Sequence, residues 1–109
     1  MANAIYIQKG ESLDYVNESE SDTIHAGEIV AFGTGIGVAG MDIKPGQSGS
    51  LHVVGVFNIP KDTEEIEFGD ALYFDADTGT ISTNSDCVPC GYAAGYAAAG
   101  APMVPVKIG

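Results

Sequence analysis

Short apolar runs that alternate with polar residues recur along the whole chain. Five such runs occupy residues 4–7, 28–32, 50–57, 71–74 and 103–108. Residues 50–57 are rich in β-branched and aromatic side chains, which favour β-strands. Pro105 cannot donate to a strand ladder, so we expect residues 103–108 to lie at a sheet edge or to end near this proline. The pattern leaves no room for a long helix.

Glycine and proline separate these runs at close intervals, as is typical of turns between short strands. Residues 44–49 predict a loop, and residues 75–79 predict a hairpin that leads into residues 80–82, with Gly79 at the left-handed position. The alanine-rich residues 92–101 are ambiguous, because alanine favours helix while glycines interrupt the run every few residues. We interpret them as a strand followed by a turn.

These elements predict an all-β protein, a small β-barrel-like or sandwich domain with an extended N-terminal arm. We expect residues 1–24 to form the arm and an acidic loop, and residues 25–109 to form the β-barrel-like body. The arm itself is expected to extend from about Ala2 to Val16, and the polar residues 17–22 form the loop. A chain of 109 residues is the length of one domain with one core.

The charge balance is strongly acidic, with fifteen Asp and Glu against four lysines and a formal net charge of −11. The lysines are scattered along the chain at Lys9, Lys44, Lys61 and Lys107. Binding to a phosphate backbone requires clustered cations, so we expect no direct nucleic-acid partner. An acidic surface instead steers a protein toward basic patches on a protein partner.

Neither a membrane partner nor secretion is expected. No apolar run approaches the roughly 20 residues that span a bilayer. Residues 1–10 also lack the charged start and the apolar stretch of a secretory signal, so we expect synthesis and use in the cytoplasm.

One glycine pattern invites a nucleotide-binding interpretation. Residues 35–40 read GIGVAG, which matches the dinucleotide fingerprint. That motif works only when a helix N-terminus follows and receives the pyrophosphate. Because Asp42 and the sequence Lys44-Pro45-Gly46 follow directly, no helix can begin there, and we interpret the run as a glycine-rich strand and turn.

Cys87 and Cys90 have the spacing of a thiol redox pair. Such a pair requires a helix start inside an alternating strand and helix pattern, which is not present here. A zinc site needs two further ligands, and His25 and His52 are far away in the sequence. Packing of both cysteines on a strand is the simpler interpretation, with redox or metal binding as the alternative.

Three acidic or polar motifs have plainer explanations than a site. Residues 75–79 resemble a calcium loop, but the third oxygen ligand and the later glutamate are missing. Asn17-Glu18-Ser19 is a formal glycosylation sequon that has meaning only after secretion. The carboxylates at Asp62, Glu64, Glu65 and Glu67 are typical of a solvated face. We therefore expect no catalytic residue, no metal and no cofactor.

Seven segments, in order, resemble a family of short phage proteins. These are residues 6–15, 26–30, 36–40 with Asp42 and Pro45-Gly46, 55–61, 68–75 with Thr78-Gly79, 90–93 and 104–108. The chain is similar over nearly its full length to capsid cement or head decoration proteins, formerly a domain of unknown function. Some members are labelled as recombinases of the RecA or RadA type. We do not transfer that label, because a recombinase needs a phosphate loop and a basic DNA path.

The resemblance implies a β-barrel-like homotrimer on three-fold and quasi-three-fold positions of an icosahedral head. Its partners would be the major capsid protein and further copies of itself, and its location the outer capsid surface of the virion. Such a trimer would cement the shell. The alternatives are a host-surface or glycan-binding module displayed on the head and a recombination-associated, nucleotide-dependent protein.

Two groups of residues are candidates for contacts. In the arm, Ile5, Tyr6 and Ile7 are expected to add a strand to an exposed edge of a capsid subunit or a neighbouring copy. Candidates for packing within a trimer are Val54, Val56, Phe57 and Ile59, with the small residues of 91–99. For this second group a private core within one subunit is an equal alternative.

Overall fold

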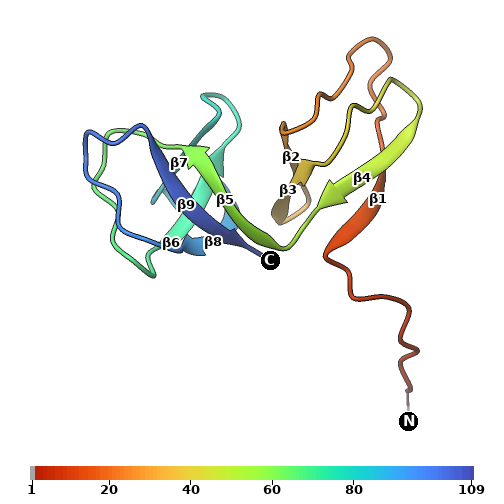
Figure 1. The fold of residues 1–109 in the computed structure, drawn as a ribbon, viewed down its shortest axis with the longest axis horizontal. Coiled ribbons are helices and arrows are strands. Elements are labelled where there is room, and N and C mark those ends of the chain that lie inside the picture. Colours follow the sequence, from red (N-terminus) through yellow and green to blue (C-terminus); the bar gives the residue numbers. More distant parts are fainter. Residues whose placement is uncertain (1) are drawn as a thin grey trace.

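The computed structural model describes residues 2–109, and in this part of the chain it consists of strands and loops without helices (Figure 1). The nine strands are β1 (Ser12–Val16), β2 (Ile29–Phe32), β3 (Gly35–Ala39), β4 (Ser48–His52), β5 (Gly55–Pro60), β6 (Ala71–Asp75), β7 (Thr80–Ser82), β8 (Val88–Ala93) and β9 (Met103–Ile108). They form two antiparallel sheets with the orders β1-β4-β3-β2 and β5-β9-β8-β6-β7. The all-β class is confirmed.

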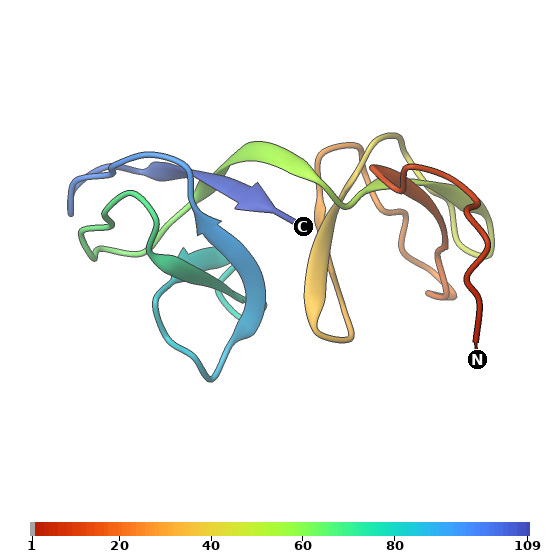
Figure 2. The same cartoon turned by 90° about the horizontal axis from the view of Figure 1, so that it is seen from below.

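The two sheets belong to two lobes that lie side by side, with the arm on the side of the first lobe that faces away from the second (Figures 1 and 2). We call β1–β4 the N-lobe and β5–β9 the C-lobe. The radius of gyration is 15.0 Å, whereas a compact chain of this length has about 13 Å. The molecule is therefore broad and flat, with extents of 44 × 40 × 22 Å.

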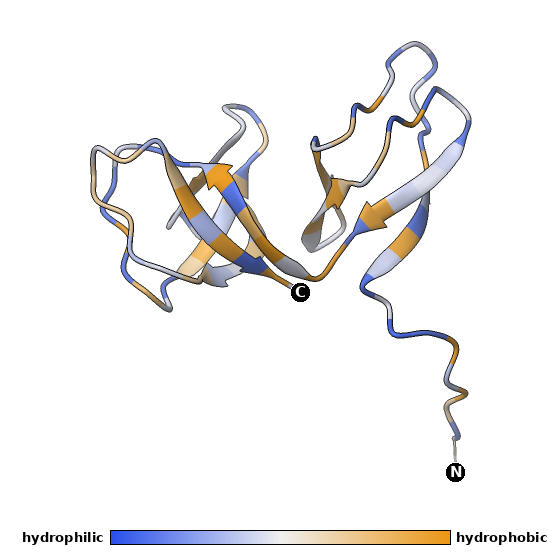
Figure 3. Ribbon diagram, viewed as in Figure 1, coloured by the Kyte–Doolittle hydropathy of each residue, from blue (hydrophilic) through white to orange (hydrophobic). Residues whose placement is uncertain are grey.

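One core extends through both lobes. Ile66, Ile81, Val104, Val106 and Ile108 are fully buried in the C-lobe. From the N-lobe, Ile36 and Val38 of β3 join the same cluster, and Ile29 of β2 packs against it. Hydrophobic residues recur along β3, β5 and β9, the strands that supply many members of this cluster (Figure 3). This shared core fixes one lobe against the other.

The prediction of a single strand over residues 50–57 is wrong. Its first half lies in β4 and its second half in β5, in different sheets. The chain turns between them because Gly55 has a φ of +145°, which other residues rarely adopt. Val53 N–H donates to the carbonyl of Glu11, the residue before β1, so residue 53 is still hydrogen-bonded on the N-lobe side.

The arm is shorter than expected and holds no strand of its own. Residues 12–16, predicted as its end, form β1, in which Leu13 lies opposite Leu51 of β4. The alternating residues 4–7 form no strand in the single chain, because no other strand lies beside them. The extended arm is thus residues 2–11, and a loop at 17–22 follows β1 as expected.

The expected edge position of Pro105 is also wrong, since β9 lies between β5 and β8. The proline is tolerated because the ladder between β8 and β9 begins only at the pair Ala93 and Val106. In a strand, N–H and C=O of one residue point to the same side. The Pro105 carbonyl accepts a hydrogen bond from Ala94 N–H at 2.8 Å, so it faces the residue after β8. An N–H group on residue 105 would point to the same side, past the last pair of the β8–β9 ladder.

Other predictions are confirmed. Residues 75–79 form the turn of the β6–β7 hairpin, with Gly79 at φ +72°. The glycine pattern at 35–40 is β3 and the turn after it, and residues 92–101 contain the end of β8 followed by turns.

The two lobes repeat one topology. When β7 is set aside, the orders β1-β4-β3-β2 and β5-β9-β8-β6 correspond strand for strand. The same backbone hydrogen bonds recur before β2 and before β6. In the N-lobe, Gly27 N–H donates to Ala39 O and Ala39 N–H donates to Glu28 O. In the C-lobe, Gly69, Ala93 and Asp70 make the same pair of bonds. The chain is therefore a tandem of two related units.

Candidate interaction surfaces

The arm presents the most exposed apolar side chains of the protein. Ile5, Tyr6 and Ile7 are 86%, 80% and 85% exposed. No hydrogen bond joins any of residues 2–9 to the rest of the described chain. Exposed apolar side chains in a row mark a contact with another molecule more often than a free surface.

The predicted trimer contacts divide into two sets. The outward set consists of Val54, in the link between β4 and β5, and Val56 of β5, which are 40% and 59% exposed. Ile59 is only 2% exposed, so its side chain belongs to the private core. Phe57 is half-buried and packs against the same core. Tyr92 extends the outward set, because Val56 and Tyr92 both lie opposite Lys107 of β9.

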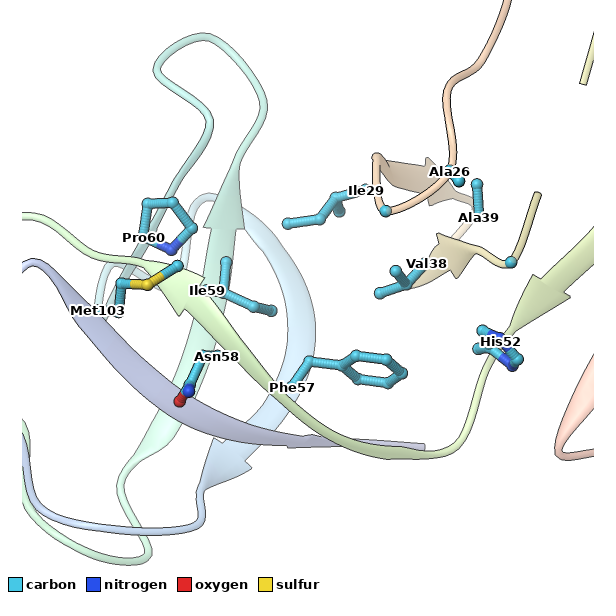
Figure 4. A pocket seen from close by; sticks show the side chains of 12 residues that line it. Ala26, Ile29, Val38, Ala39, His52, Phe57, Asn58, Ile59, Pro60 and Met103 are labelled. Atoms are coloured by element: carbon cyan, nitrogen blue, oxygen red, sulfur yellow. The ribbon is translucent and has the colours of Figure 1, made fainter. Parts of the chain in front are cut away.

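A groove of about 620 Å³ lies between the lobes. Ile29 and Val38 line it from the N-lobe, and Phe57 and Ile59 line it from the C-lobe (Figure 4). At its end, His52 Nδ1 is hydrogen-bonded to Ser12 Oγ at 2.9 Å. The groove is apolar, and His52 is a structural residue within it.

The surface charge is almost entirely negative. Lys61 is 7% exposed, and its Nζ donates to the carbonyls of Asp62, Glu64 and Ala99 at 2.9, 2.6 and 3.3 Å. Lys107 Nζ likewise donates to the carbonyl of Ile108 at 3.1 Å. Among residues 2–109 the one ion pair joins His25 and Asp42 at 4.0 Å. Two of the four lysines thus donate to backbone carbonyls of the same chain and form no ion pair with the carboxylates in this part of the chain.

Carboxylates in the acidic segments accept backbone hydrogen bonds within turns. Asp75 Oδ1 accepts from Asp77 N–H, and Asp70 Oδ2 accepts from Glu67 N–H, both at 2.9 Å. Tyr96 donates to Glu65 at 2.6 Å, and this hydrogen bond raises the pKa of Tyr96. Within the described residues, no three His, Cys, Asp or Glu side chains are placed to hold a metal ion.

The sequon asparagine is a structural residue. Asn17 is 2% exposed. Its side-chain amide donates to the carbonyls of Asp22 and Ile43 at 2.8 and 2.9 Å. Asn17 follows β1 as Lys61 follows β5, so the two repeats each place one buried donor at the same point. No sequence pattern signals either role.

The cysteines are free thiols at the start of β8. Cys90 is buried at 6% exposure, and burial raises its pKa to about 11. A redox thiol needs a lowered pKa, so Cys90 lacks that chemistry and acts as a packing residue.

We predict that the two thiols differ in reactivity. A raised pKa leaves only about one in a thousand Cys90 thiols ionised at pH 8. Cys87, which is half-buried, should react with iodoacetamide at least about tenfold faster. Mass spectrometry of the alkylated native protein measures this ratio, and equal rates would contradict the burial of Cys90.

Comparison with known proteins gives one match. No significant match was found among the curated proteins or among the solved structures. The part of the chain that the structure describes contains no helix long and apolar enough to cross a membrane. Residues 7–108 match the model of the phage cement protein family. The chain therefore belongs to the phage cement proteins, which are non-enzymatic structural proteins of the phage capsid.

Proposed function

We propose that this cement protein binds the outer surface of the capsid as a homotrimer at three-fold and quasi-three-fold sites and stabilises the head. The observation that carries the proposal is the exposed apolar arm, Ile5 to Ile7, attached to a rigid acidic body. Such an arm gains free energy by adding to a neighbouring protein. The body supplies a surface of one charge sign, which favours a basic partner.

The trimer explains how weak contacts reinforce the shell. Packaged DNA presses outward, and capsid subunits at a three-fold site are held by their mutual contacts. A trimer of matching symmetry bridges several subunits at once. After one contact forms, the others form at high effective concentration. The exposed Val54 and Val56 are proposed contacts between its copies.

Purified protein added to mature heads that lack it should bind to saturation at a fixed ratio to the major capsid protein. Because we expect a basic partner surface, raising the salt from 0.05 to 0.5 M should weaken binding roughly tenfold. Sedimentation of heads with bound protein measures both. Decorated heads should also retain DNA to a higher temperature than bare heads. Absence of saturable binding would contradict the proposal.

A further inference from the structure

The C-lobe contains one strand that the N-lobe lacks. In the C-lobe, β7 pairs with β6 and places Ile81 opposite Phe74. It then reaches β5, because Ile81 forms a parallel bridge with Lys61 and accepts a hydrogen bond from Asp62 N–H. Ile81 is 0% exposed and Phe74 is 7% exposed. Strand β7 thus closes the C-lobe between β5 and β6.

The N-lobe stays open at the corresponding place. Its end strands are β1 and β2, the counterparts of β5 and β6. Phe32 of β2 corresponds to Phe74 of β6. Phe32 lies five residues after the turn glycine Gly27, and Phe74 lies five residues after the turn glycine Gly69. Phe32, however, is 39% exposed. Leu13 of β1, on the same side of the sheet as the buried Leu51, is 41% exposed.

The arm has the composition of the missing strand. Residues 4–7 alternate in a way that predicts a strand, yet they have no partner within their own chain. In an extended conformation Ile5 and Ile7 point to one face and Tyr6 to the other. Two isoleucines on one face match the exposed apolar side chain of Phe32 at the free edge of β2.

We infer that the arm of a second copy of this protein closes the N-lobe. Residues 4–7 pair antiparallel with the free edge of β2 and lie beside the end of β1, as β7 does in the C-lobe. Ile5 and Ile7 pack toward Phe32, and Tyr6 faces outward. This inference rests on the self-association proposed above and adds the arm to Val54 and Val56 as a contact between copies.

The chain's own arm cannot take this place. The closing strand lies parallel to β1, as β7 lies parallel to the end of β5. Parallel neighbours need a crossover of about a dozen residues or more. Only residues 8–11 separate Ile7 from β1. The donor must be another copy, and donation from each copy to the next forms a ring when the rotation between copies closes.

The test compares face-specific arm variants in solution. We expect the wild-type chain to sediment as an oligomer at about 100 μM. The double variant Ile5→Asp/Ile7→Asp should associate at least tenfold more weakly, because two carboxylates would enter an apolar site. Tyr6→Asp adds a charge in the same segment on the outward face, so it is the matched control and should retain the oligomer.

A second measurement identifies the partners. In a Cys87→Ser/Cys90→Ala background, one chain carries Ile7→Cys and another carries Phe32→Cys. A disulfide between them is necessarily intermolecular, and we expect it to form more readily than with Tyr6→Cys. A monomeric wild type, an oligomer that survives Ile5→Asp/Ile7→Asp, or equal cross-linking of Tyr6→Cys would each overturn the inference. An oligomer of any kind that fails to bind heads would instead overturn the proposed function.

Discussion

Replacing Gly91 by alanine is expected to unfold the protein. A Cβ at this position would lie 1.9 Å from the carbonyl oxygen of Lys107 in β9, and φ is +143°. The clash is with backbone in the centre of the C-lobe sheet, so no side-chain movement relieves it. We expect a loss of at least about 5 kcal/mol, which is comparable to the whole stability of many domains.

Circular dichroism during thermal unfolding measures this effect, and Gly100→Ala is the matched control. Gly100 has no positive φ, and a Cβ there meets nothing within 4 Å. The control should therefore unfold within a few degrees of the wild type. A cooperative transition at wild-type temperature for Gly91→Ala would show that β8 and β9 are not packed as described.

The second large effect is expected for Lys61→Ala, which should lower the free energy of unfolding by roughly 3 kcal/mol. The substitution leaves three carbonyls, of Asp62, Glu64 and Ala99, without the ammonium that they share. These part-buried carbonyls then lose a charged donor. Urea unfolding measures the change.

Lys44→Ala separates this effect from the change in net charge. Lys44 is exposed, and its ammonium makes no hydrogen bond within residues 2–109. Both variants raise the negative charge by one, but only Lys61→Ala removes internal bonds. Equal stability of the two variants would contradict the structural role of Lys61.

Local chemistry predicted the turns better than the sheets. Gly79 marked the β6–β7 hairpin because a left-handed residue at that point is required by local geometry alone. In residues 50–57, by contrast, strand propensity continues through Val53 and Val54 into the next strand. Propensity cannot reveal that the two halves join different sheets, because this depends on partners far away in the sequence.

The sequence contains a short repeated turn pattern that strand periodicity alone does not reveal. Residues 24–28, 43–47 and 66–70 share the pattern Ile-x-x-Gly followed by Glu, Gln or Asp. Each forms a bridge residue and a turn before a strand. The fourth turn, at residues 98–101, lacks the isoleucine, which conceals the period. The shared pattern of these segments predicts two related units.

The exposure of the candidate contact residues could be predicted only in part. The exposure of Ile5, Tyr6 and Ile7 followed from an apolar segment that precedes the first paired strand. Ile59 and Val56 have the same residue character in the sequence, but alternation along β5 turns one inward and the other outward. The sequence pattern does not reveal which face is the core until the partner β9 is placed.

Electron cryo-microscopy of the intact phage particle tests the central claim most directly. We predict density for this chain on the outside of the head, in groups of three over the three-fold and quasi-three-fold positions, in contact with the major capsid protein. Density for the chain inside the shell or in the tail, or a head without it, would contradict the claim.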